Sequence, residues 1–76
     1  GYTAEAAGAL MKIVSDAAYK KGVREYAAMG LRNYLSAMPG RDKTELKEVL
    51  GGILANEKNP PAGVGRLFKR LDNTKP

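Results

Sequence analysis

Apolar residues recur at every third or fourth position along most of this 76-residue chain, which is the pattern of amphipathic α-helices. The clearest run lies in residues 43–55, and its apolar members are Leu46, Val49, Leu50, Ile53 and Leu54. Asp42 followed by Glu45 is a variant of the capping box, which predicts that aspartate caps the start of this helix. Gly51 and Gly52 interrupt the run, which weakens the helix but lets another backbone approach closely.

Two further helices are predicted N-terminal to this one, over residues 4–21 and 23–38. Thr3 is a suitable N-cap for the first, because its hydroxyl can accept a hydrogen bond from a free backbone amide. Gly22 can end that helix in the left-handed conformation, and Pro39 ends the second helix. Because Gly22 alone separates the two segments, one bent helix is the alternative to two helices.

A fourth helix is predicted over residues 61–72, because proline is favoured in the first turn of a helix and an apolar stripe follows it. The stripe consists of Val64, Leu67, Phe68 and Leu71. Polar and apolar residues nowhere alternate with period two over a useful length, so no sheet is expected. The sequence therefore predicts an all-α fold, a small single-domain bundle of about four helices over residues 1–72, with residues 73–76 as a flexible tail or the start of a linker.

The residue types that are absent narrow the chemistry. The chain has no histidine and no cysteine, so serine triads, thiol catalysis and the usual zinc ligand sets are excluded. We therefore expect a protein that is not an enzyme and has no metal, no cofactor and no small-molecule substrate. No apolar run approaches the roughly 18 residues that cross a bilayer, so a membrane partner is not expected. The absence of cysteine suits a reducing compartment and favours the cytoplasm or nucleus.

Positive charge is concentrated in two parts of the chain. The net charge is +5, and it is +4 over residues 20–41 and +4 over residues 58–76, whereas residues 1–19 and 42–57 are net negative. A helix with one apolar and one basic face can pack on a core and present cations to phosphates. We therefore predict a nucleic-acid-binding module that contacts mainly the phosphate backbone through the second and fourth helices, in a regulatory or DNA-associated role. The candidate contact residues are Lys21, Arg24, Arg32, Arg66, Lys69 and Arg70.

Three alternatives stand beside this hypothesis. Lysine and arginine are good helix formers, so the basic faces also fit an ordinary solvated surface. The small residues of the first two helices, with Met29 on the polar side of the second, favour a protein–protein interaction or oligomerisation domain, such as a homodimer. The basic segment 61–72 also has the character of a membrane-surface helix, although it is short and lacks tryptophan.

Two further features bear on nucleic-acid binding through the fourth helix. The third and fourth helices resemble the helix-turn-helix arrangement in outline, but their connector, about residues 55–60, is longer than the usual tight turn. Gly63 and Gly65 are expected to let a phosphate approach the amide groups at the start of the fourth helix.

The tyrosines of the second helix bear on the kind of nucleic acid. Tyr26 and Tyr34 are eight residues apart, and we expect boundary positions with buried rings and solvated hydroxyl groups. A stacking platform for single strands is the alternative, and it requires these rings to be exposed beside the basic residues.

Overall fold

A computed structural model describes residues 1–73 of the chain. It contains four α-helices and one 3₁₀ turn: α1 (Ala4–Ser15), α2 (Lys21–Tyr34), η1 (Leu35–Ala37), α3 (Gly40–Asn56) and α4 (Ala62–Asp72). There is no strand in residues 1–73, and α1 and α2 are separate helices. The predicted all-α bundle of four helices is confirmed.

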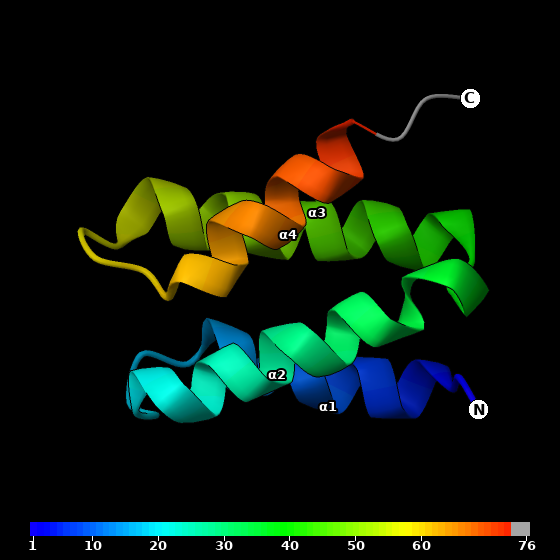
Figure 1. Ribbon diagram of the computed structural model, residues 1–76, viewed down its shortest axis with the longest axis horizontal. Coiled ribbons are helices and arrows are strands. Elements are labelled where there is room, and N and C mark those ends of the chain that lie inside the picture. The colour runs from blue at the N-terminus through cyan, green and yellow to red at the C-terminus, as the bar shows by residue number, and fades with distance from the viewer. Residues whose placement is uncertain (74–76) are drawn as a thin grey trace.

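The helices run alternately in opposite directions along the bundle (Figure 1). α1 packs against α2 and α3, and α4 also packs against α2 and α3, so each helix contacts two neighbours. In the view of Figure 1, α2 and α4 face the reader and α1 and α3 lie behind them. The two helices with a net positive charge therefore lie side by side on one face of the bundle.

The break between α1 and α2 lies at residues 16–20 and not at Gly22. Asp16 leaves the helical conformation, and its Oδ1 accepts a hydrogen bond from the backbone N–H of Ala18 at 2.9 Å. Such a turn offers the backbone an alternative to the helix, so α1 ends at Ser15, well before the predicted Lys21. Gly22 lies in the first turn of α2, and no glycine among residues 1–73 has a positive φ. The predicted left-handed cap at Gly22 is therefore wrong.

The C-terminal end of the second predicted helix also differs. α2 ends at Tyr34, and the 3₁₀ turn η1 carries the chain to Met38, which has extended backbone and a buried side chain. A 3₁₀ turn is a common way to end an α-helix, since it uses the last carbonyl groups. The Met38 side chain is thus part of the core, but Met38 follows the 3₁₀ turn η1 and does not belong to α2.

α3 begins earlier than predicted. Pro39 is its N-cap residue, and the Pro39 carbonyl accepts hydrogen bonds from the N–H groups of Asp42 and Lys43, both at 3.0 Å. The predicted cap at Asp42 is therefore wrong, because Asp42 lies inside the first turn. Its carboxylate instead accepts a hydrogen bond from the Tyr2 hydroxyl, and this bond raises the pKa of Tyr2 to about 12. The contact ties the segment before α1 to the start of α3.

α4 lies close to its predicted boundaries. Pro61 is the N-cap residue, the helix begins at Ala62, and Asn73 follows its last residue as the C-cap. The predicted tail therefore begins at a capping residue, and residues 74–76 lie outside the described part of the chain.

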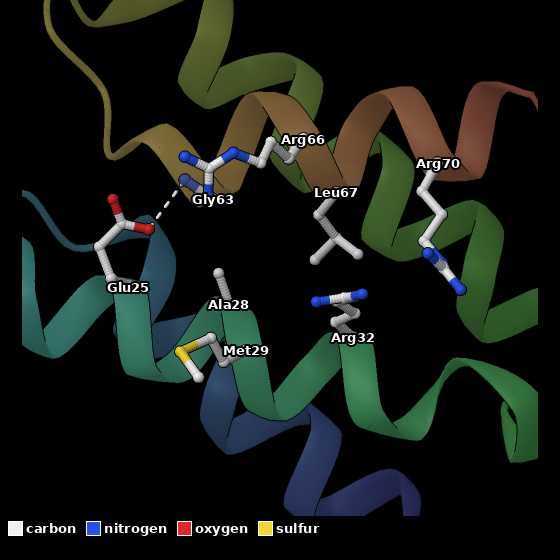
Figure 2. Close-up of a pocket in the computed structure, with 8 residues that line it drawn as sticks. All are labelled: Glu25, Ala28, Met29, Arg32, Gly63, Arg66, Leu67 and Arg70. Atoms are coloured by element: carbon white, nitrogen blue, oxygen red, sulfur yellow. Dashed lines mark hydrogen bonds between the residues drawn. The ribbon is translucent and has the colours of Figure 1, made fainter.

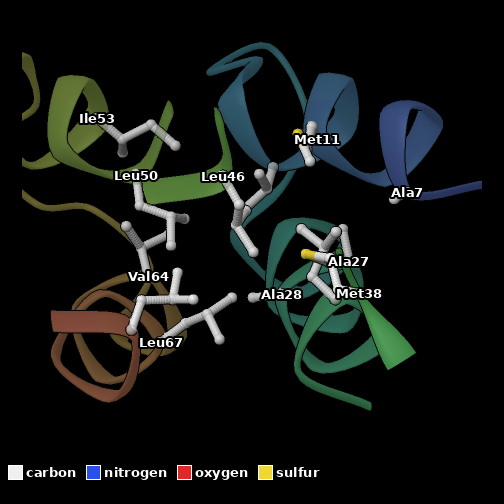
Figure 3. Packing of buried hydrophobic residues seen from close by; sticks show 13 residues of the cluster. Ala7, Met11, Ala27, Ala28, Met38, Leu46, Leu50, Ile53, Val64 and Leu67 are labelled. Carbon is white, nitrogen blue, oxygen red and sulfur yellow. The ribbon is translucent and has the colours of Figure 1, made fainter. Parts of the chain in front are cut away.

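The core is formed by the inward-facing stripes of the four helices (Figure 3). Its members with no exposed surface are Val14, Leu31, Leu46, Leu50 and Val64. The predicted stripes of the third and fourth helices are largely buried, although Leu54 is 36% exposed. Burial of a leucine or valine side chain contributes about 1.5–3 kcal/mol, so this cluster is the main source of stability for a chain without disulfides.

Gly52 is a position at which alanine should stabilise the protein. It lies inside α3, and a Cβ atom built there meets no other atom within 4 Å. Gly52→Ala is expected to raise the free energy of unfolding by about 0.5–1 kcal/mol, because alanine loses less backbone entropy in a helix. Urea denaturation measures the change.

Gly30→Ala provides the control for this prediction. A Cβ atom at Gly30 lies 3.0 Å from Leu10 Cδ1, so Leu10 must move and part of the helix-propensity gain is lost. A Gly30→Ala variant as stable as Gly52→Ala, or more so, would contradict the packing described here.

Candidate nucleic-acid interface

A groove of about 470 Å³ lies between α2 and α4 (Figure 2). It is lined by Glu25, Ala28, Met29, Arg32, Gly63, Arg66, Leu67 and Arg70. On α4 these residues recur with spacings of three and four, which places them on one side of the helix. The groove thus joins one stripe of α2 to one stripe of α4.

Three arginines line this groove, Arg32 from α2 and Arg66 and Arg70 from α4. All three are exposed. In Figure 2 the Arg66 guanidinium lies near Gly63, toward Glu25, whereas Arg32 lies below Leu67 and Arg70 lies to the right of it. With Glu25 as the single acidic residue of the lining, the groove carries an excess of positive charge. The structure therefore brings together three of the six predicted contact residues.

The start of α4 is already occupied by an anionic group of the protein. The backbone N–H of Gly63 donates a hydrogen bond to Glu25 Oε1 at 2.8 Å. A Cβ atom at position 63 would lie 2.5 Å from that oxygen, so glycine is what lets the carboxylate approach. The first amides of a helix attract anions, and here Glu25 meets that demand. The expectation that Gly63 admits a phosphate at this amide is therefore wrong.

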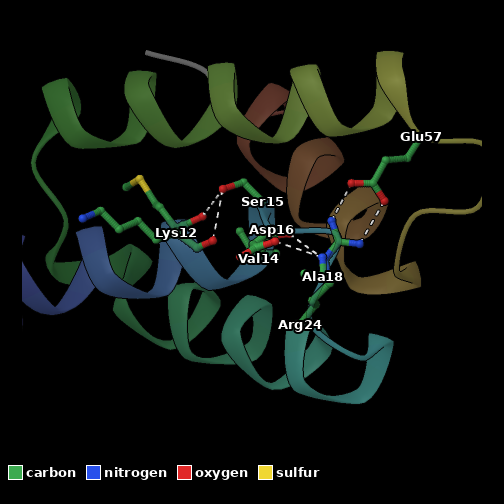
Figure 4. A network of polar contacts seen from close by, with 8 residues as sticks. Lys12, Val14, Ser15, Asp16, Ala18, Arg24 and Glu57 are labelled. Carbon is green, nitrogen blue, oxygen red and sulfur yellow. Dashed lines mark hydrogen bonds and ion pairs between the residues drawn. The ribbon is translucent and has the colours of Figure 1, made fainter.

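Arg24 is not a surface residue, and its assignment as a contact residue is wrong. Its side chain is 3% exposed and lies between the C-terminal ends of α1 and α3 (Figure 4). Nε donates to the Val14 carbonyl at 2.9 Å, and Nη1 and Nη2 donate to Glu57 Oε1 and Oε2 at 2.9 and 2.6 Å. Arg24 thus satisfies a carbonyl in the last turn of α1 and pairs with the C-cap residue of α3.

The paired charges shift each other's protonation. The hydrogen bonds to Glu57 raise the pKa of Arg24, and the same bonds hold the pKa of Glu57 below its usual value. The Lys21 charge also lowers the pKa of Glu57. Both groups therefore stay ionised near neutral pH.

The burial of Arg24 has a signal in the sequence. Arg24, Ala27, Ala28 and Leu31 follow the spacing i, i+3, i+4, i+7, and all four are buried. Val23, which directly precedes this stripe, is 43% exposed. An arginine at a position of the buried apolar stripe is thus predicted to be a buried ion-pair partner.

Lys21 and Lys69 lie outside the groove, and both are exposed. Lys21 is one turn before Glu25 on α2, so it continues the groove-facing side of that helix beyond the groove. Lys69 lies about 100° away from Arg70 around the α4 axis. The two lysines extend the positive surface at its edges without forming the groove.

The two tyrosines of α2 have different surroundings. Tyr34 is partly buried and packs edge-on against the Tyr2 ring, with 5.4 Å between ring centroids. Tyr26 is 75% exposed, so the expected burial of its ring is wrong. Met29, three residues further along α2, is 56% exposed, as its position on the polar side predicts.

A groove on the opposite side of the bundle has a different charge balance. A second groove, of about 500 Å³, is lined by residues of α1 and α3: Glu5, Gly8, Ala9, Met11, Lys12, Ser15, Glu45 and Val49. Two glutamates and one lysine supply its charge. The lining of this groove therefore carries one net negative charge, whereas the lining of the α2–α4 groove is net positive.

The chain matches no protein family, and no characterised protein or solved structure shows significant similarity to it. The geometry and charge of the α2–α4 groove are therefore the features that bear on function.

Sequence reasoning missed the apolar floor of this groove, which Ala28, Met29 and Leu67 supply. It also missed Glu25 as the partner of Gly63. Both features depend on how α2 packs against α4, and the sequence of either helix alone does not reveal that packing.

Within the described residues, no helix has the length and apolar character needed to cross a bilayer.

Proposed function

We propose that this protein is a nucleic-acid-binding module that contacts the phosphate backbone through the groove between α2 and α4. The observation that carries the proposal is the convergence of Arg32, Arg66 and Arg70, from two helices, on one exposed groove. Guanidinium groups donate in a planar fork that suits phosphate oxygens. Binding without catalysis is part of the proposal, because the groove contains arginines and one glutamate already engaged by a backbone amide.

The difference in charge between the two grooves supports nucleic acid over a simple solvated surface. A solvated surface requires only polar residues, with the two signs mixed. Here the α2–α4 groove is net positive, and the α1–α3 groove is net negative. A polyanion is therefore attracted more strongly to the α2–α4 groove than to the α1–α3 groove.

The salt dependence of binding tests this proposal. The binding constant K is measured by fluorescence anisotropy of a labelled oligonucleotide at salt concentrations between about 50 and 200 mM, the range over which phosphate contacts weaken. A plot of log K against log salt concentration then gives the slope. Three arginine–phosphate contacts are expected to give a slope of about −2 for a single strand, at roughly −0.7 per contact. An affinity that does not change with salt would exclude phosphate contacts as the basis of binding.

A protein partner or homodimer is the second candidate, and the observation that favours it is exposed apolar surface. Tyr19, Val23, Tyr26 and Met29 are each at least 43% exposed and follow one another along the α1–α2 corner and α2. Exposed apolar side chains gathered in one region often mark an interface. Sedimentation over a range of protein concentrations distinguishes the two: a concentration-independent monomer removes the homodimer.

A further inference from the structure

The groove has an apolar floor between its charged groups, and phosphate alone does not explain it. Ala28 and Leu67 are buried under the groove, while Met29 is exposed at its side. An anion gains nothing from apolar contact, because it loses hydration there. The ligand that fits must therefore combine negative charge with a flat apolar part.

We propose that the α2–α4 groove selects single-stranded over double-stranded nucleic acid, with one unpaired base seated between the arginines over Met29 and Leu67 and a neighbouring base stacked on Tyr26. This rests on the proposed function and names its ligand more closely. A volume of about 470 Å³ lies in the range of small-ligand sites, roughly 300–1,000 Å³, and a single nucleotide is a ligand of that size. A base inside a duplex is paired and stacked and cannot enter the groove.

Tyr26 supplies an independent argument for an unpaired ligand. It is 75% exposed and lies three residues before Met29, so the two side chains are neighbours on the surface of α2. An exposed ring beside a positively charged groove is the arrangement by which proteins bind single strands. Arginine planes and the methionine thioether also make favourable contacts with aromatic bases. A paired duplex leaves Tyr26 without a base to stack on.

The same features speak against an acidic peptide as the ligand. A peptide carboxylate pairs with arginine as a phosphate does, but it requires no exposed aromatic ring beyond the groove. The inference thus depends on both the arginines and Tyr26.

The experiment compares a labelled 12-nucleotide single strand of mixed sequence with the same strand annealed to its complement. The wild-type protein is expected to bind the single strand at least five times more tightly. Tyr26→Ala is expected to lower the single-strand affinity about fivefold or more, since stacking contributes about 1–3 kcal/mol per base, or about 5- to 160-fold. Tyr26→Phe keeps the ring and is expected to retain the affinity.

Tyr19→Ala is the matched control. Tyr19 is also an exposed tyrosine, at 45%, but it lies in the turn between α1 and α2, whereas Tyr26 lies on α2 three residues from the groove residue Met29. Its removal is expected to leave the single-strand affinity unchanged.

Four outcomes decide the question. A preference for the single strand that Tyr26→Ala removes and Tyr19→Ala retains supports the inference. Equal affinity for both forms with normal salt dependence overturns the inference and leaves the proposed function standing. If the wild-type protein binds neither the single strand nor the duplex, both this inference and the proposed function are overturned. Poly-glutamate of matched charge that binds as tightly as the single strand also overturns the inference, because charge alone then explains the affinity.

Discussion

Replacing Arg24 with alanine is expected to lower the free energy of unfolding by about 3 kcal/mol. The change leaves the Glu57 carboxylate and the Val14 carbonyl without the donors that now reach them. Breaking a buried ion pair costs about 3–5 kcal/mol, and the low end applies because the Glu57 side chain keeps 22% of its exposure. In a domain of this size the melting temperature should fall by about 12–24 °C.

Arg32→Ala is the control for this prediction. Arg32 is an exposed arginine on the same helix, and its removal is expected to change stability by no more than about 0.5 kcal/mol. Thermal unfolding followed by circular dichroism measures both variants. Equal melting temperatures for Arg24→Ala and Arg32→Ala would show that the buried pair does not stabilise the fold.

The Arg24–Glu57 pair also predicts a pH dependence. The pKa of Glu57 is lower in the folded state than its ordinary value of 4.5, so the contribution of the pair is fully present above that value. It is lost as the pH falls from 4.5 through the lower folded pKa. In Glu57→Gln this part of the acid dependence should disappear. A wild-type protein and a Glu57→Gln variant with the same stability profile in acid would contradict the assignment.

Replacing Arg66 and Arg70 together with alanine is expected to lower oligonucleotide affinity about 30-fold at low salt. The estimate assigns about 1 kcal/mol to each exposed arginine–phosphate contact. The slope of log K against log salt concentration should become shallower by about 1.4, since two contacts of roughly 0.7 each are removed. Anisotropy titrations at several salt concentrations give both quantities, and a melting curve confirms that the variant is folded.

Lys12→Ala with Lys43→Ala is the matched control, because it removes the same charge from α1 and α3. If binding follows the net charge of the whole protein, both double variants lose affinity equally. If it follows the α2–α4 face, the lysine variant stays close to the wild type. Equal losses would contradict a localised interface.

The fold was predictable where local signals and packing agree. Thr3 caps α1 as predicted, with Ala6 N–H at 3.0 Å from its Oγ1, and the stripes of α3 and α4 enter the core. The α1–α2 break was misplaced because Gly22 is a strong local signal. Ala17 and Ala18 favour a helix by propensity, yet the Asp16 side chain turns the chain there.

The site was predictable only in part, for a tertiary reason. The sequence identifies Arg32, Arg66 and Arg70 as basic residues opposite an apolar stripe, but only the packing of α2 on α4 shows that they share a groove. The same packing places Glu25 against Gly63. Arg24 has the same charge as the other basic residues of α2, but its position falls on the buried stripe of the helix. The position of an arginine relative to that stripe decides whether its side chain faces solvent or the core.

Mapping the contact surface by nuclear magnetic resonance tests the central claim most directly. The protein, labelled with ¹⁵N, is titrated with the unlabelled 12-nucleotide single strand while the backbone amide shifts are followed. We predict the largest changes in two stretches, residues 25–32 of α2 and 63–70 of α4. Largest changes in α1 and α3, or no changes at saturating oligonucleotide, would contradict the proposal that the α2–α4 groove binds nucleic acid.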